Sequence, residues 1–111
     1  MSKAYIIKRE KDGAISLLCQ GHDKKGNVVE ERPAGPFDIG NSSAGTYALS
    51  LAIMLHYMGA NANDAAATAE ARRRTPRFMT AFLSHHPMRE IGATYDIDGS
   101  RLDYFFSVAP Q

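Results

Sequence analysis

A single cysteine, Cys19, is present among the 111 residues, so no disulfide can form within the chain. This excludes the disulfide-rich class of small secreted domains and favours the reducing cytoplasm, where we expect the protein to reside. The longest apolar run, residues 48–58, is interrupted by polar side chains and is shorter than the roughly 20 residues that span a bilayer. No apolar signal core follows the N-terminus, so we expect no association with a membrane.

Neither sign of charge predominates, because 13 Lys and Arg residues stand against 12 Asp and Glu residues. No field over the whole surface therefore attracts nucleic acid or anionic lipid, and any such attraction must be local. A hydrophobic share of 44%, with five Phe and five Tyr, suffices for one modest core. The length fits a single domain over residues 1–111.

Residues 1–33 predict a β meander. The segments KAYIIKRE and AISLLCQG flank Asp12-Gly13, a dipeptide typical of tight hairpin turns. A second turn, HDKKGN, leads to NVVEER, and Pro33 ends the ladder because proline has no N–H to donate. We expect an antiparallel sheet with one face against a helix and the other face in water.

A loop rich in Gly, Pro and Ser, residues 34–43, separates the meander from residues 44–108, which we expect to be helical. The first helix is expected to run from about Ala44 to Met58. It is apolar on nearly every side, which is typical of a buried helix at the centre of a domain. Gly59 suits the left-handed residue that ends such a helix.

Two shorter helices are predicted next. The first is expected to begin at Asn61 or Asn63 and to run through DAAATAEARRR. Thr75 precedes Pro76, a context that disfavours helical geometry, so a break and a new helix, PRFMTAFLSH, are expected there.

The tail, ATYDIDGSRLDYFFSV, is compatible with a hairpin about Asp98-Gly99 or with a short helix capped by Ser100, and we favour the helix. Together these segments predict an α+β fold. In it, a three-stranded antiparallel sheet packs against a central buried helix with two to three shorter helices.

The stretch DIGNSSAGTYALSLAIML begins with a loop close to the phosphate-binding pattern G-x-x-x-x-G-K-[ST]. In that pattern, N–H groups at a helix N-terminus cradle the phosphates while a lysine reaches the terminal ones. Here Thr46 and Tyr47 replace the lysine and its neighbour, and the preceding strands are antiparallel. We favour a helix capped by Ser42 or Ser43, with anion or nucleotide binding as the alternative. The candidate contacts for an anion are Gly40, Asn41, Ser42, Ser43, Gly45 and Thr46.

The densest run of charge is an arginine cluster formed by Arg72, Arg73, Arg74 and Arg77. Guanidinium groups contact phosphates and carboxylates bidentately, so the cluster is a candidate contact for nucleic acid or for an acidic protein. The alternative, which we favour, is a solvated helix end, in which Glu70 can pair with Arg73 or Arg74. No aromatic residue is interleaved with these arginines to stack on bases.

The remaining polar motifs are incomplete. Cys19, His22 and Asp23 lie near the end of a predicted strand, and His85 and His86 precede a proline. Zinc needs three or four converging ligands, so we expect no metal site. We also expect no cofactor and no enzymatic activity, because no complete catalytic set is visible.

The stretch GPFDIGNSSAGTYALSLAIML resembles a family of small uncharacterised proteins of bacteria and their phages, classed as a domain of unknown function. Their shared pattern is a Gly-Phe loop, a Ser or Gly pair and a helix rich in Leu and Ala. Ile39 stands where the family often has an aromatic residue. The resemblance implies a protein of mobile elements that acts by binding another macromolecule. The matching positions are Gly35, Phe37, Asp38, Gly40, Ser43, Gly45, Leu49, Ala52, Ile53 and Leu55.

We therefore expect a small non-catalytic binding protein of a phage or mobile element, which acts on a protein partner as an inhibitor or modulator. Nucleic-acid binding through the arginine cluster is the first alternative. Anion or nucleotide binding at the start of the central helix is the second. Self-association into a homo-oligomer stays open.

Overall fold

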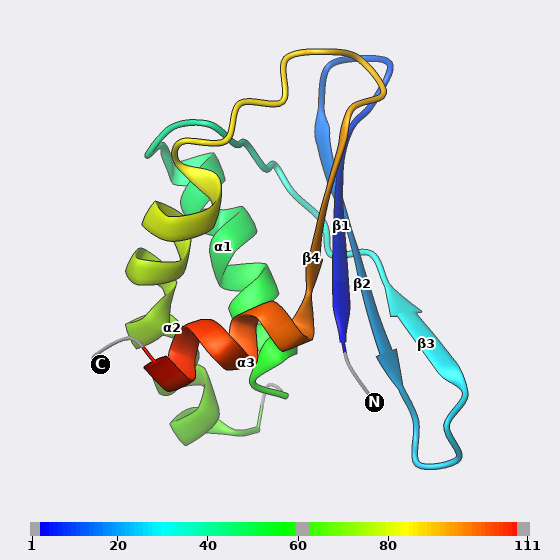
Figure 1. Cartoon of the computed structure of the whole chain (residues 1–111), viewed down its shortest axis with the longest axis vertical. Helices are drawn as coiled ribbons and strands as arrows, with labels where there is room; N and C mark the ends of the chain where they lie inside the picture. Colours follow the sequence, from blue (N-terminus) through cyan, green and yellow to red (C-terminus); the bar gives the residue numbers. More distant parts are fainter. Residues whose placement is uncertain (1–2, 60–62, 109–111) are drawn as a thin grey trace.

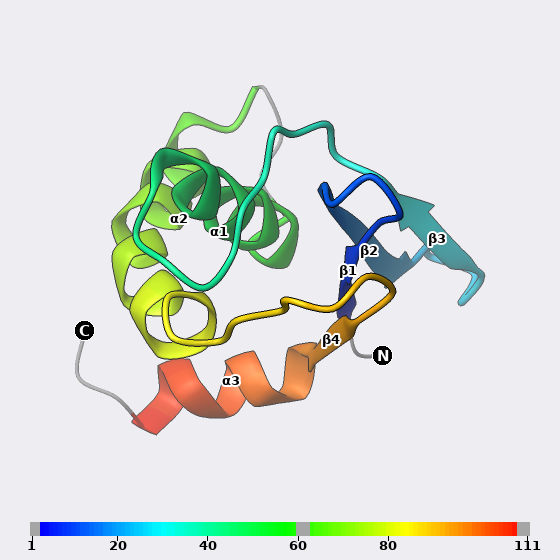
Figure 2. The ribbon, with the colours of Figure 1, turned by 90° about the horizontal axis from the view of Figure 1, so that it is seen from above.

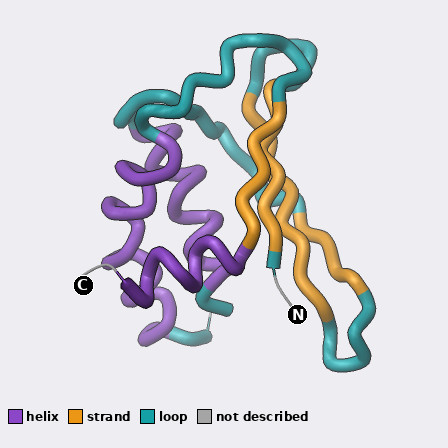
Figure 3. The backbone as a smooth tube through the Cα atoms, viewed as in Figure 1, coloured by secondary structure: helices purple, strands orange, loops and turns teal. Residues whose placement is uncertain are grey.

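The computed structural model describes residues 3–59 and 63–108. It shows an antiparallel sheet with all helices on one face (Figures 1 and 3). The elements are β1 (Ala4–Arg9), β2 (Ile15–His22), β3 (Val28–Glu31), α1 (Ala44–Tyr57), α2 (Ala65–Phe78), the π-helical turn η1 (Met79–Leu83), β4 (Thr94–Asp98) and α3 (Gly99–Val108). The predicted α+β class is confirmed.

The sheet has four strands in the order β3-β2-β1-β4. The meander β1-β2-β3 and its first turn are confirmed, with Gly13 at a φ of 88°. The prediction of three strands is wrong, because β4 pairs antiparallel with β1, from Ala4↔Asp98 to Lys8↔Thr94. The segment 44–108 is therefore not purely helical, and a strand returns to the sheet before the last helix.

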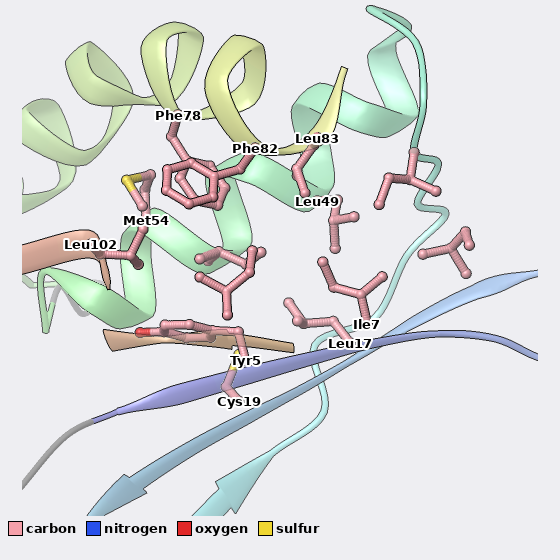
Figure 4. Packing of buried hydrophobic residues seen from close by; sticks show 14 of the residues in the cluster. Tyr5, Ile7, Leu17, Cys19, Leu49, Met54, Phe78, Phe82, Leu83 and Leu102 are labelled. Carbon is pink, nitrogen blue, oxygen red and sulfur yellow. The ribbon is translucent and has the colours of Figure 1, made fainter. Parts of the chain in front are cut away.

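The core lies between the inner face of the sheet and the helices (Figure 4). Alternate residues of β1 and β2, beginning with Tyr5 and Ile15, point inward and are buried. Within the described residues, no helix covers the opposite face, as the view from above shows (Figure 2), so the expectation of one wet face is confirmed. The helices supply to this core Leu49, Ile53, Met54, Phe78, Phe82, Leu83, Leu102 and Phe106.

Helix α1 begins and ends within one residue of its predicted limits, but it is not buried on nearly every side. Leu55 and its neighbours on one face are only half-buried, whereas the polar Thr46 and Ser50 are fully buried. Burial of these hydroxyls is tolerated because each has a partner. The Ser50 hydroxyl donates to the Thr46 carbonyl at 2.9 Å, and the Thr46 hydroxyl donates to Asn41 Oδ1 at 2.6 Å.

The predicted break at Pro76 is wrong, because α2 continues through this proline to Phe78. The missing N–H of Pro76 falls in the last turn, and the chain then widens into η1, in which the N–H of Ser84 donates to the carbonyl of Met79 at 2.8 Å. The N-cap of α2 is Asp64, whose carboxylate accepts the N–H of Ala67 at 2.9 Å. Asn63 is therefore not the cap, and Asn61 lies outside the described residues.

The short final helix is confirmed as α3, and the hairpin about Asp98-Gly99 is wrong. Ser100 is not the cap, because the helix has already begun at Gly99 and the Asp98 carboxylate accepts the N–H of Ser100 at 3.1 Å. Figure 2 shows α3 running from the end of β4 along the helical layer. There, the rings of Phe105 and Phe106 pack against side chains of α1, α2 and η1.

Candidate functional site

The loop before α1 satisfies its own hydrogen bonds. Ser43 is the N-cap, as predicted, and its hydroxyl accepts the N–H of Thr46 at 3.4 Å. Asn41 Oδ1 accepts from the N–H of Ser43 at 2.9 Å, and the Asp38 carboxylate accepts from Asn41 Nδ2 at 3.0 Å. Side chains of the loop itself therefore accept the N–H groups of Ser43 and Thr46 at the start of α1.

Two glycines of the loop are explained by close packing. A Cβ on Gly45 would lie 2.9 Å from the Cβ of Asp38, so glycine allows the carboxylate to approach the helix. Gly40 has a φ of 82°, and its N–H donates to the carbonyl of Leu83 at 2.9 Å. The hydrogen bonds from Asn41 and from the Ile39 N–H hold the pKa of Asp38 below its usual range. A bound anion would have to compete with this carboxylate, which disfavours an anion site here.

The arginine cluster is divided between two sides of α2. Arg73 and Arg74 both donate to Glu70, at 2.5 Å and 2.8 Å, which confirms the expected pairing. These bonds lower the pKa of Glu70 to about 2. Arg77 shares this side, whereas Arg72 lies on the opposite side of the helix, since successive residues turn by about 100°.

Three arginines lie over phenylalanine rings between α2, η1 and α3. Such cation–π contacts occur about once per 70–80 residues, so three in one region are a local concentration. This arrangement could not be predicted from neighbouring residues, because two of the rings belong to α3, far along the chain. The distances from Cζ to ring centroid are 4.9 Å for Arg74 and Phe106, 5.4 Å for Arg77 and Phe105, and 5.0 Å for Arg101 and Phe82.

A second candidate site is a cleft of about 400 Å³ between the C-terminal half of α1 and the edge of the sheet at β3. Its apolar wall comes from the half-buried face of α1, and its polar groups come from β3, α1 and the residue before β1. Sequence reasoning missed it because these groups are far apart along the chain. The lining residues are Lys3, Glu31, Pro33, Ala52, Leu55, His56 and Gly59.

His56 lines this cleft and contacts residues of the sheet layer. Its Nδ1 lies 3.0 Å from the hydroxyl of Tyr5, which is fully buried. Burial raises the pKa of Tyr5 far above its usual range, so the phenol stays protonated. It donates to Nδ1 in the tautomer that carries the ring proton on Nε2. Lys3 Nζ donates to the carbonyl of His56 at 2.7 Å. Burial and the Lys3 charge lower the pKa of His56, and the Glu31 carboxylate opposes them.

This arrangement predicts a pH-dependent stability. The lowered pKa of His56 means that the unfolded chain binds the proton more readily, so stability is retained above the usual histidine pKa of about 6.5 and is lost as the pH falls toward the folded-state pKa. His56→Asn, whose amide oxygen can accept from Tyr5, should reduce this slope in urea unfolding between pH 7.5 and 5. His22→Asn, at an exposed histidine of β2, should keep it. An unchanged slope in His56→Asn would contradict the prediction.

The cysteine and histidine motifs noted in the sequence do not come together in one site. Cys19 is on the inner face of β2 and His22 is on the outer face, because side chains alternate along a strand. Burial raises the pKa of the Cys19 thiol to about 12, so the thiol is no nucleophile near neutral pH. His86 stacks on Tyr95, with ring centroids 3.7 Å apart. Over residues 3–59 and 63–108, no three His, Cys, Asp or Glu side chains are grouped to hold a metal ion.

Comparisons of the chain with protein-family models, with curated proteins and with solved structures found no match. The resemblance to small bacterial and phage proteins therefore stays a prediction. In the described part of the chain, no helix has the length and apolar character needed to cross a membrane.

Proposed function

We propose that this protein is a small non-catalytic binding protein that takes an extended segment of a protein partner onto the free edge of β3. The observation that supports this proposal most is the exposure of β3 at the end of the sheet, beside the cleft. Val28 and Val29 are 61% and 43% exposed, so two adjacent apolar side chains of this strand are in contact with solvent. Figure 1 shows the β2–β3 hairpin extending away from the helices. An exposed edge strand is a template for pairing with another chain.

The backbone of β3 offers hydrogen bonds to such a segment. The N–H of Asp23 donates to the carbonyl of Asn27 at 2.9 Å, which makes these two residues a hydrogen-bonded pair. Hydrogen-bonded and non-hydrogen-bonded pairs alternate in an antiparallel ladder. From the register His22↔Val28, the pairs of Val28 and of Glu30 with β2 are non-hydrogen-bonded. Their N–H and C=O groups therefore point away from β2, toward the free edge.

The side chains of β3 give this edge a preference. Glu31 is paired with Cys19, so it lies on the inner side of the sheet, where it lines the cleft together with Leu55. Glu30 lies on the outer side and also carries a negative charge. A partner strand would direct alternate side chains into the cleft, as in strand addition to other sheets. Charge complementarity favours a partner strand with a basic side chain near Glu31 and apolar neighbours.

Occupation of this edge would allow the protein to act as an inhibitor or modulator. A partner whose strand is held at β3 cannot use the same strand for its own contacts. Origin in a phage or mobile element rests on the resemblance of the loop and the helix that follows it. Neither a cofactor nor a catalytic step is needed for this mode of action.

The proposal is tested with a displayed library of random linear peptides, selected on the immobilised protein. Glu30→Pro removes the outward N–H without removing a backbone bond to β2, and proline is tolerated on a sheet edge. It also removes the side-chain bond from Gln20 to the Glu30 carboxylate. Glu30→Thr is the matched control, since it removes the same carboxylate and keeps the N–H. We expect selected peptides to bind the wild type with micromolar Kd. Binding should weaken about tenfold or more in Glu30→Pro and less than about threefold in Glu30→Thr, as expected for loss of one hydrogen bond and its neighbours.

Equal binding by both variants, or no peptide above background, would rule out strand addition at β3. The oligomeric state, measured by analytical ultracentrifugation, is the second test. If the wild type forms a dimer that Glu30→Pro dissociates, the occupant of the edge is another copy of this chain, and the proposal of a different protein partner is overturned.

A further inference from the structure

We propose that the surface formed by α2 and α3 binds single-stranded nucleic acid, with arginines at the phosphates and Tyr104 stacked on a base. This basic surface comprises Arg73, Arg74, Arg77, Arg101 and Tyr104. It lies on other elements than the β3 edge and does not depend on partner binding there.

The basic surface has an excess of positive charge, although the whole chain has a net charge of only +1. On this surface, four arginines stand against the carboxylates of Glu70 and Asp103, and Arg72 is not counted because it lies on the opposite side of α2. Both carboxylates are already engaged, Glu70 with two arginines and Asp103 with the hydroxyl of Tyr57 at 2.5 Å. Among the described residues, no carboxylate lies within ion-pair distance of Arg101. A polyanion would complement this charge.

The arginines are held in place by the rings beneath them. Arg77 lies over Phe105 and Arg101 lies over Phe82, and these two rings are in edge contact, with centroids 5.3 Å apart. Both guanidinium groups therefore border the same pair of rings. A stacked guanidinium keeps N–H donors in its plane, which is the geometry that binds phosphate bidentately. Because the side chains are already ordered, less conformational entropy is lost on binding.

Tyr104 supplies an exposed aromatic ring on which a base can stack. It is 59% exposed and follows Arg101 by three residues on α3, so the two side chains share a face of the helix. In the described part of the chain, its ring stacks on no other aromatic ring. A base from a single strand can stack on such a ring, whereas the bases of a duplex are not accessible. The combination of ordered arginines and an exposed ring favours a single strand over an acidic protein.

The experiment is fluorescence anisotropy with a labelled 15-nucleotide dT strand, titrated with the full chain at 50 to 200 mM NaCl. Tyr104→Ala should weaken binding by about 5- to 150-fold, the range measured for loss of one base–aromatic stack, and should leave the salt dependence unchanged. Arg101→Gln should reduce the slope of log K against log[NaCl] by about 0.7, the value for one phosphate contact to a single strand.

Arg72→Gln is the matched control, because it removes the same charge from the opposite side of α2. It should change the affinity less than about twofold. Circular dichroism at each condition confirms that the variants are folded. Absence of saturable binding at 50 mM NaCl, or equal losses in Arg72→Gln and Arg101→Gln, would overturn the proposal. A further pair of results would also overturn the proposal. If polyglutamate competes as effectively as unlabelled dT, and Tyr104→Ala keeps full affinity, the ligand is an acidic polypeptide.

Discussion

Replacement of Phe78 by alanine is expected to lower the free energy of unfolding by about 3–5 kcal/mol. Phe78 is fully buried at the end of α2, and its ring stacks on Phe82 with centroids 5.0 Å apart. Figure 4 shows it between the helices, above the inner face of the sheet. Truncation removes apolar contacts and leaves a cavity that the neighbouring elements cannot fill. Since small domains are stable by only about 5–15 kcal/mol, much of the total would be lost.

Urea unfolding followed by far-ultraviolet circular dichroism measures this effect. Phe78→Leu should cost less than the alanine variant, because it retains most of the buried volume. Tyr104→Ala removes an aromatic side chain that is 59% exposed and should change stability by less than about 0.5 kcal/mol. A loss below about 1.5 kcal/mol in Phe78→Ala would show that this ring is not a central part of the core.

The parts of the fold that sequence reasoning predicted correctly are those with local signals. Asp12-Gly13 marks the first hairpin, and the N–H of Gly13 donates back to the carbonyl of Glu10 at 2.9 Å. Ser43 and Gly59 mark the ends of α1, because a hydroxyl at the N-cap and a glycine at positive φ satisfy groups within one turn. Each of these signals is read from neighbouring residues.

Strand β4 was missed because its partner is distant along the chain. Tyr95 and Ile97 alternate with polar residues, a pattern that fits a strand, but the segment is short and rich in aspartate. What makes it a strand is pairing with β1, as in Tyr5↔Ile97. The break at Pro76 was predicted from a local rule, and burial of Thr75 and Phe78 on either side outweighs that rule.

The candidate sites divide in the same way. The Gly- and Ser-rich loop was conspicuous in sequence, yet Asp38 and Asn41 satisfy the helix start from within. The cleft was not visible in sequence, because it brings Lys3 and Glu31 to the end of α1 from the other layer. His56 stood within an apolar run, and only Tyr5, from β1, shows why a histidine is there. The position of the polar groups in the cleft therefore depends on contacts between residues that are far apart in the sequence.

Gly99→Ala is expected to destabilise the protein, although alanine is the better helix former. By propensity alone, the change within α3 would stabilise by roughly 0.5–1 kcal/mol. The surroundings reverse this expectation, because a Cβ at position 99 would lie 2.7 Å from the carbonyl oxygen of Lys3 and 3.1 Å from its nitrogen. The same carbonyl accepts the N–H of Gly99 at 2.6 Å, so neither backbone can retreat without losing that bond. We expect a loss of about 1–3 kcal/mol, typical of overpacking.

The direction of the change makes this test decisive. Thermal and urea unfolding of Gly99→Ala should both show lower stability, and the matched control Ser100→Ala, at the next and exposed position of α3, should stay within about 0.5 kcal/mol of the wild type. A variant as stable as the wild type or more stable would contradict the close approach of α3 to the residue before β1. Because Lys3 also holds the end of α1 through the His56 carbonyl, movement of its backbone should disturb the cleft. Peptides selected at β3 should then bind Gly99→Ala less tightly than Ser100→Ala.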